Sequence, residues 1–259
     1  MRVLLPPSEA KSPGGRGRPL AARAPHPTLG AARERTLGAL AQLVAGPPAD
    51  AAAALLLPPG TIDDALAANA RVREARTMPA LERYAGVLYD GFASAGLGDG
   101  ERGVAARTIL VFSGLLGVVR GDEAVPLYRV PAKAVLPGIG VAGTFWRPVL
   151  DEAMPALLFR GGLVIDLRSS DYTAMWRPKG AVARRVVTVR VLSPLSSGRL
   201  GVVSYPSKFA KGQLAAALVR RLAAAEPVDT VADVAAAWLA CGGPRAESEA
   251  ANQLVLYTA

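Results

Sequence analysis

The chain opens with MRVLLPPSEAK, residues 1–11, where a short apolar run meets two prolines and then a polar turn. We expect residues 2–5 to form a buried strand that the prolines end, because proline has no N–H for pairing inside a sheet. Loops at strand ends are where parallel or mixed sheets meet ligands. The turn carries a hydroxyl, a carboxylate and a cation in Ser8, Glu9 and Lys11. We predict that it binds a phosphate or sugar, or performs acid–base chemistry; a solvated salt bridge is the alternative.

A second stretch, VIDLRSSDY at residues 164–172, has the same layout, since an apolar strand leads into hydroxyls and carboxylates. Asp166 lies inside that strand, and a buried carboxylate is costly unless it is paired. We therefore expect Asp166 to form an ion pair with a Lys or Arg, either functional or purely structural, with Lys179 or Lys11 as natural partners. The polar residues that end this stretch join the candidate site: Ser169, Ser170, Asp171 and Tyr172.

Strands and helices are interspersed along the rest of the chain without a strict repeat. Apolar runs predict strands at 163–167, 184–192, 200–205 and 254–257, while 109–112 fits either a strand or a helix. Helical patterns cover 31–44, 147–158 and 207–225. The segment 12–30 is rich in Gly, Pro and Arg, so we expect an exposed, flexible loop. No linker divides the chain, which predicts one α+β domain over residues 1–259.

Two local patterns predict where helices begin. Thr61 with Asp64, and Thr230 with Asp233, have the spacing of capping boxes. A helix after Pro79 is expected to bury one apolar face, formed by Leu81, Tyr84, Leu88 and Phe92.

Composition limits the chemistry. The chain has 259 residues, 51% hydrophobic, which is ample for a core. Its net charge of +9 and isoelectric point of about 10.2 suit a phosphate-bearing partner, although a merely solvated basic surface is the alternative. One cysteine, Cys241, and one histidine, His26, allow neither a disulfide within the chain nor a zinc cluster. We expect no metal and no cofactor.

The sequence predicts a cytoplasmic location. No signal peptide is visible, because only three apolar residues precede the first prolines. Arg and Pro interrupt every window before it reaches the ~20 apolar residues of a membrane span. We expect no membrane partner, and a monomer.

Arginine supplies nearly all the positive charge, so the few lysines are informative. A lysine ammonium approaches phosphate as a compact point charge, or loses its proton and acts as a nucleophile, which an arginine cannot do. Persistence by chance is the alternative. The lysines are Lys11, Lys133, Lys179, Lys208 and Lys211.

Two glycine-containing stretches are weaker candidates. FSGLLGVVR at 112–120 frees backbone N–H groups at Ser113 and Gly114 and ends in Arg120, so it could approach a ligand closely. LPGIG at 136–140 looks like the hairpin of a helix-hairpin-helix element, which holds a DNA phosphate. A plain loop is favoured there, because Pro131 limits the helix before it.

Together these motifs resemble the YaaA peroxide-stress family. They are collinear from residue 1 to about 215, and residues 254–257 resemble the closing strand of the family. The matching segments are 4–11, the Tyr-x-Gly-x-x-Tyr-x-Gly pattern at 84–91, 112–120, 127–129, the Phe-Trp pair at 145–146, 166–172, and 204–208 continuing to 212. The chain departs from the family pattern at Asp166, Leu116 and Gly121, where Asn, Tyr and Pro are usual.

The resemblance implies a cytoplasmic protein that protects DNA during peroxide stress. It also implies a mixed α/β fold, with a central mixed sheet flanked by helices, and a positively charged cleft that binds DNA.

Three functions stay open at this point. The first is DNA binding, to duplex or single strands, or binding of a nucleotide-like small molecule. Phosphate contacts would dominate, and Tyr128, Trp146 or Tyr172 would stack on an unpaired base. The residues expected to bind phosphate or nucleic acid are Ser8, Lys11, Ser113, Gly114, Arg120, Arg129, Ser169, Ser170, Tyr172, Lys179, Lys208 and Lys211.

The second function is an enzyme acting on a nucleoside, a nucleotide or a damaged DNA base. Lys11 would be its nucleophile or charge stabiliser, with Glu9 or Asp171 as the acid–base group. Such a lysine could form a Schiff base with a deoxyribose aldehyde, as a glycosylase/lyase does. The third is a structural or interaction protein whose charge is only a solvated surface.

Overall fold

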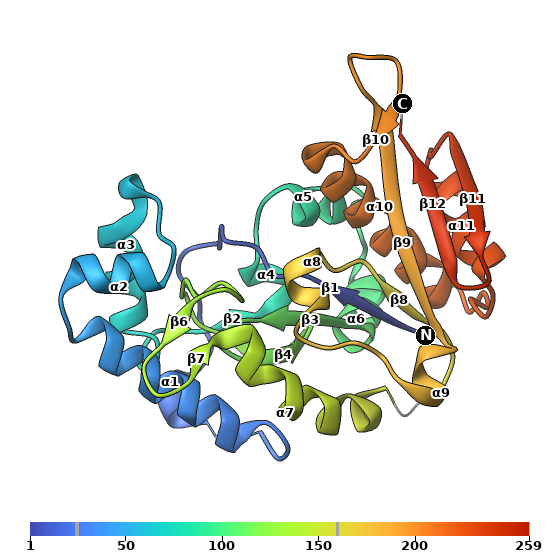
Figure 1. The fold of residues 1–259 in the computed structure, drawn as a ribbon. Coiled ribbons are helices and arrows are strands. Elements are labelled where there is room, and N and C mark those ends of the chain that lie inside the picture. The colour runs from blue at the N-terminus through green and yellow to red at the C-terminus, as the bar shows by residue number, and fades with distance from the viewer. Residues whose placement is uncertain (24–25, 159–160, 259) are drawn as a thin grey trace.

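The computed structural model describes residues 1–23, 26–158 and 161–258, and its centre is one sheet with helices on both faces (Figure 1). Five strands run parallel in the order β12–β9–β8–β1–β3, and antiparallel strands β11 and β4 lie at the two ends of this series. Their bounds are β1 Arg2–Leu5, β3 Ile109–Ser113, β4 Gly117–Arg120, β8 Val164–Asp166, β9 Val186–Pro194, β11 Arg245–Ala250 and β12 Gln253–Tyr257. The expected α+β class, with a mixed central sheet flanked by helices, is confirmed.

Strand β1 lies in the middle of the sheet, between β3 and β8. Its side chains alternate between two apolar layers, as the pleat requires. Val3 and Leu5 join the layer under the helices α5 (Val87–Ala93), α10 (Ser204–Ala223) and α11 (Val231–Ala240). Leu4 faces the other layer, built on α7 (Ala142–Leu157). All three side chains are fully buried, so the first apolar run of the sequence is the centre of the core.

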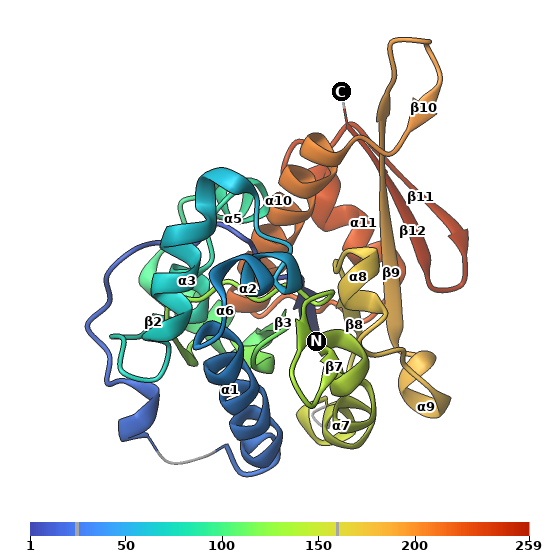
Figure 2. The same ribbon diagram turned by 60° about the vertical axis from the view of Figure 1, so that its left-hand side comes forward.

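The remaining helices surround this frame. The helices α1, α2 and α3 pack on one another beyond the β4 end of the sheet (Figures 1 and 2). Three short strand pairings lie off the main sheet path: β2 with β5, β6 with β7, and β10 with β9. The bounds are η1 Leu20–Ala22, α1 Gly30–Val44, α2 Pro48–Ala54, η2 Pro59–Thr61, α3 Ile62–Ala70, β2 Met78–Pro79, α4 Ala80–Arg83, α6 Asp99–Thr108, β5 Ala124–Val125, β6 Val135–Leu136, β7 Gly140–Val141, α8 Ser170–Thr173, α9 Gly180–Ala183 and β10 Leu200–Gly201.

The single helix expected after Pro79 is wrong, because the chain forms two short helices, α4 and α5. Gly86 separates them with a φ of 102°, a conformation that L side chains rarely adopt. A Cβ at this position would lie 3.1 Å from Ser8 Oγ. The break therefore brings the backbone of residue 86 against the turn that follows β1.

Of the two predicted capping boxes, one is confirmed and the other is wrong. Thr230 and Asp233 form the expected capping box, with Asp233 N donating to Thr230 Oγ1 at 3.2 Å and Thr230 N donating to Asp233 Oδ2 at 2.9 Å. The box at Thr61 is wrong, because Thr61 Oγ1 donates to the carbonyl of Pro58 instead. The strand predicted at 200–205 is also too long: it ends at Gly201, and α10 begins at Ser204.

The segment expected to be a flexible loop, 12–30, contains only η1 before α1 begins, and residues 24–25 fall outside the described residues. Its first part is tied to the protein by Arg83, whose guanidinium donates to the carbonyls of Ser12, Gly14 (2.8 Å), Arg76 (3.2 Å) and Val125 (3.1 Å). The flexibility of this segment stays a prediction.

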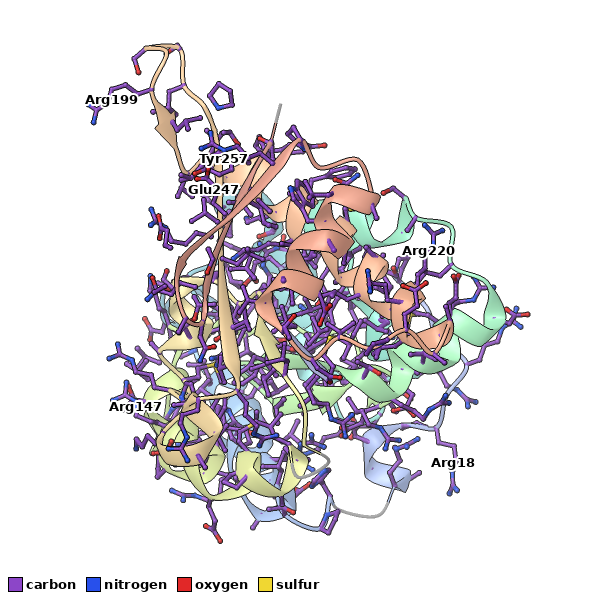
Figure 3. All side chains as sticks on the ribbon, turned by 90° about the vertical axis from the view of Figure 1, so that its right-hand side faces the viewer. Arg18, Arg147, Arg199, Arg220, Glu247 and Tyr257 are labelled. Carbon is purple, nitrogen blue, oxygen red and sulfur yellow. The ribbon has the colours of Figure 1, made fainter. Side chains whose placement is uncertain are left out.

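The surface charge is widely distributed. Figure 3 shows Arg18, Arg147, Arg199 and Arg220 on well-separated parts of the molecule, with Arg199 on the hairpin that links β9 and β10. Within the described residues, none of the helices has the length and apolar character needed to cross a membrane.

Candidate functional site

Three of the parallel strands, β3, β1 and β8, are neighbours and end at the same edge of the sheet. The turns that follow them are residues 6–11, 114–116 and 167–169. These turns carry Ser8, Glu9, Lys11, Gly114 and Ser169 of the residues singled out in the sequence, which is why those residues come to one edge of the sheet. Ligands of open parallel sheets bind at this edge.

The Lys11 side chain is held without a carboxylate. Its Nζ donates to the carbonyl of Ser8 at 2.7 Å, and lies 4.4 Å from the ring centre of Tyr128 and 5.3 Å from that of Tyr84. Within the described parts of the chain, no acidic group comes within 4.0 Å of Nζ. Burial lowers the pKa of Lys11 from 10.5 to about 8; the charge of Glu9 opposes this shift and that of Arg129 adds to it.

A hydrogen-bonded chain of hydroxyl groups lies beneath Lys11. Tyr84 Oη and Tyr128 Oη are 2.8 Å apart, and Tyr128 Oη is 2.6 Å from Ser113 Oγ. Ser113 Oγ also accepts from the backbone N–H groups of Leu115 (3.2 Å) and Leu116 (2.9 Å). Burial raises the pKa of Tyr128 to about 12 and that of Tyr84 as well, so both phenols stay neutral. Ser113, expected to contact phosphate, is instead buried within this chain.

The edge of the site is made of partly exposed ion pairs. Arg129 Nε lies 3.5 Å from Glu9 Oε2, and Lys133 Nζ lies 2.9 Å from Asp171 Oδ1. The backbone of Arg129 is fixed by Asn69 of α3, which accepts from Arg129 N at 2.8 Å and donates to Arg129 O at 3.0 Å. Sequence reasoning missed Asn69, because only its burial inside α3 distinguishes it. We call Ser8, Glu9, Lys11, Tyr84, Tyr128 and Arg129 the Lys11 cluster.

The expected pairing of Asp166 with a Lys or Arg is confirmed, but the named partners, Lys179 and Lys11, are wrong. Arg168 fills that role, with Nε 2.9 Å from Oδ1 and Nη2 2.7 Å from Oδ2 of Asp166. Both side chains are buried, and the guanidinium lies over the rings of Phe112 and Trp176. The partner is two residues away rather than distant, because alternate residues of an extended segment share a face. This pair supports the turn after β8.

Lys211 adds a second lysine close to this pair. Its Nζ donates to the carbonyl of Arg168 at 3.3 Å, and burial lowers its pKa while the charge of Asp166 opposes the shift. Lys208 lies one helical turn earlier on α10 and is exposed. Lys179 is elsewhere, paired with Asp151 of α7 at 2.6 Å, so the structure does not bring it to the Lys11 cluster.

The serines and aromatic residues predicted for the site differ in their exposure. Ser169 and Ser170 are exposed at the start of α8, and Tyr172 is buried behind them, where burial raises its pKa and the charge of Glu9 adds to the rise. Trp146 is fully buried and donates from Nε1 to the carbonyl of Gly114 at 2.9 Å. Trp146 and Tyr128, two of the three stacking candidates, therefore present no open ring face to a base in this conformation.

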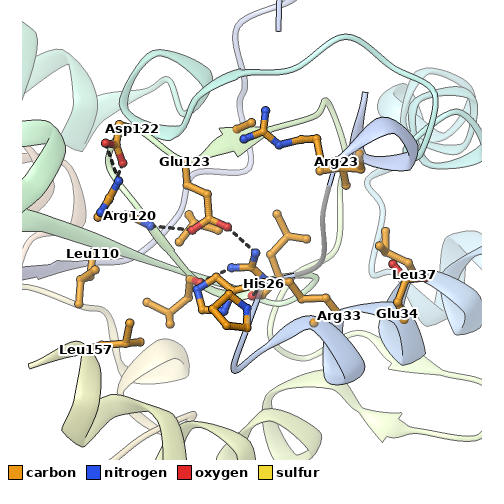
Figure 4. Close-up of a pocket in the computed structure, with 17 residues that line it drawn as sticks. Arg23, His26, Arg33, Glu34, Leu37, Leu110, Arg120, Asp122, Glu123 and Leu157 are labelled. Atoms are coloured by element: carbon orange, nitrogen blue, oxygen red, sulfur yellow. Dashed lines mark hydrogen bonds and ion pairs between the residues drawn. The ribbon is translucent and has the colours of Figure 1, made fainter. Parts of the chain in front are cut away.

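Arg120 lies apart, at a cavity of about 470 Å³ next to β4 and α1 (Figure 4). Two of the arginines at this cavity, Arg33 and Arg120, are already paired with carboxylates. Arg33 pairs with Glu123 and donates to the carbonyls of Leu116 and Val118, and Arg120 pairs with Asp122. Among residues 1–23, 26–158 and 161–258, no group of three His, Cys, Asp or Glu side chains is placed to hold a metal. The Lys11 cluster is the better candidate.

Replacing Lys11 by methionine is expected to stabilise the protein at pH 7. The folded protein has the lower Lys11 pKa, so between pH 8 and 10.5 the unfolded chain binds more protons and wild-type stability rises with pH. Below pH 8 the full cost of the buried cation is present. The free energy of unfolding should rise by about 2 kcal/mol. This is less than the pKa shift would give at ~1.4 kcal/mol for each tenfold change in proton affinity, because the side chain is partly solvated.

Urea unfolding from pH 7 to pH 10 measures this effect. The variant should lose part of the rise in stability with pH, and Lys208→Met, at an exposed lysine, should behave as wild type. A methionine variant that is less stable than wild type at pH 7 would show that the Lys11 ammonium is not held at a cost.

Comparison with known proteins gives consistent matches. A family model described as "Peroxide stress protein YaaA" matches residues 1–236. The chain is 44% identical to a UPF0246 protein of Streptomyces coelicolor over 220 residues, which cover 85% of this chain and 83% of that protein. It is 38% identical to a UPF0246 protein of Corynebacterium efficiens, with 91% of each chain covered. A UPF0246 protein of Corynebacterium glutamicum is 34% identical, with 92% of each covered.

Proposed function

The chain belongs to the YaaA family of peroxide stress proteins, and from this premise we propose that it protects DNA during peroxide stress by binding DNA phosphates at the Lys11 cluster and the neighbouring Lys211. The family match confirms the resemblance seen in the sequence motifs and supports the role in peroxide stress. Binding of DNA in a cytoplasmic location is our extension of it.

One observation carries the proposal: two lysines at adjacent strand ends are held by backbone carbonyls rather than carboxylates. Lys11 donates to the carbonyl of Ser8 after β1, and Lys211 donates to that of Arg168 after β8. Both have a lowered pKa because burial disfavours their charge. An incoming phosphate would supply the missing negative charge, and hydrogen bonds between charged partners are about twice as strong as neutral ones.

The exposed ion pairs at the edge fit the same role. Surface pairs such as Glu9–Arg129 and Lys133–Asp171 contribute only ~0–1 kcal/mol, so phosphates can replace the carboxylates at little cost. Lys208, exposed on α10, adds a further cation without a described partner. A nucleotide-like small molecule would use the same contacts, and competition with a nucleoside monophosphate distinguishes it from DNA.

We predict that replacing both Lys11 and Lys211 by alanine lowers the affinity for DNA and also makes that affinity less dependent on salt. Each lost phosphate contact should reduce the slope of log K against log salt by ~0.9 for duplex DNA, and lower affinity by about tenfold or more at low salt. Fluorescence anisotropy with labelled duplex and single-stranded DNA measures both quantities. Lys179→Ala, which removes a lysine already paired with Asp151, is the matched control.

Two results would reject the proposal. The first is the absence of DNA binding at low salt. The second is a control variant that weakens binding as much as the double variant, because the effect would then come from overall charge and not from this site.

A further inference from the structure

Resting on the proposed function, we propose that Lys11 is also a nucleophile, and that its Nζ forms an imine with the C1′ aldehyde of ring-opened abasic deoxyribose in DNA. The substrate class is therefore damaged DNA that carries an aldehyde. Peroxide-derived radicals leave such oxidised and abasic sugars in DNA.

The surroundings of Lys11 distinguish it from the paired lysines. A nucleophilic amine must lose its proton, and an adjacent carboxylate prevents this by stabilising the ammonium. Lys133 and Lys179 each have a carboxylate within 3 Å. Lys11 has the carbonyl of Ser8 and the rings of Tyr84 and Tyr128 instead. Its lowered pKa of about 8 agrees with this geometry, since the neutral amine is then populated near pH 7 to 8.

The neutral phenols also suit this chemistry. Tyr84 and Tyr128 are tied to each other and to Ser113, and burial keeps them protonated. They leave no anion beneath Nζ that would hold its proton. Glu9, two residues before Lys11, is the carboxylate whose charge acts most strongly on the lysine.

The reaction balances without an oxidant or a cofactor. The Nζ lone pair adds to C1′ and forms the C–N bond; the carbinolamine hydroxyl then takes up a proton and leaves as water, which gives the protonated imine. The imine acidifies the C2′ proton, which Glu9 accepts, while the C3′–O bond breaks and the 3′ phosphate leaves with the electron pair. Water hydrolyses the imine and returns the lysine amine.

Borohydride trapping tests the proposal on a duplex with one abasic site. Wild type should give a covalent protein–DNA adduct, and peptide mapping should place it on Lys11. Lys11→Arg keeps the positive charge but has no nucleophilic amine, so its adduct, measured at protein concentrations that saturate the abasic duplex, should fall at least about 100-fold. Lys179→Arg is the matched control and should trap as wild type.

The outcomes separate this inference from the proposed function. Normal binding of intact and abasic duplex with no trapped adduct would overturn the imine alone, and so would an adduct mapped to another residue. Failure to bind any DNA would overturn both. If Lys11→Arg does not fold, peptide mapping of the wild-type adduct shows whether the imine forms on Lys11. An adduct without strand cleavage would overturn the elimination step and leave the imine.

Discussion

Replacing Asp166 by alanine is expected to destabilise the protein by about 3–5 kcal/mol, because it leaves a buried guanidinium without its counter-charge. The Arg168 side chain is completely buried, and its two bonds to Asp166 are 2.9 and 2.7 Å long. The same guanidinium lies over the rings of Phe112 and Trp176, where water cannot replace the carboxylate. Chemical denaturation at pH 7 measures the loss.

An ion pair of aspartate and lysine at the surface, Asp151 with Lys179, provides a matched control. Asp151→Ala removes a carboxylate from an ion pair whose lysine is 75% exposed, and should cost less than about 1 kcal/mol. Replacing Asp166 and Arg168 together by leucines should recover much of the stability lost in Asp166→Ala, since no charge is then buried alone. A loss below 1 kcal/mol in Asp166→Ala would mean that Arg168 finds another partner.

Replacing Arg83 by methionine is expected to cost about 3–5 kcal/mol and to loosen residues 12–17. The Arg83 side chain is fully buried and donates to four backbone carbonyls from three separate segments. Hydrogen bonds to a charged group contribute ~1.5–3 kcal/mol each, and their sum is not additive. Methionine fills similar volume but leaves those carbonyls without a donor.

Two measurements follow this change. Urea unfolding gives the loss of stability, and limited proteolysis should cut within residues 12–23 faster than in wild type. Arg18→Met, at an exposed arginine of the same segment, should leave both unchanged. Unchanged proteolysis in Arg83→Met would show that other contacts, such as the pairing of Gly17 with Thr77, hold the segment alone.

The sequence allowed prediction of what depends on neighbours along the chain. The apolar run of β1, the two prolines and the polar turn after them follow from local composition, and so does the pairing of Thr230 with Asp233. The grouping of the turns after β1 and β8 also followed, because parallel strands end at one edge. Lysine scarcity directed attention to Lys11, but it did not separate Lys11 from Lys179, which lies elsewhere and is paired with Asp151.

What failed depends on contacts that periodicity does not encode. The apolar spacing of Tyr84 and Leu88 suits one helix, yet Gly86 breaks it to approach Ser8. Asp166 was assigned a distant lysine, whereas the nearer Arg168 has the geometry for two parallel bonds. Asn69 lies 60 residues before its partner Arg129, and Tyr84 lies more than 70 residues after Lys11. No local sequence pattern therefore indicates that they support the site.

The central place of β1 also has a consequence for the order in which the protein is made. β1 leaves the ribosome before both of its neighbours, because it pairs with residues 109–111 on one side and 164–166 on the other. At ~5–20 residues per second, its second neighbour emerges on the order of ten seconds later. Until then, an apolar strand and the Lys11 turn have no sheet to join, so a nascent chain truncated before residue 164 should need chaperone protection.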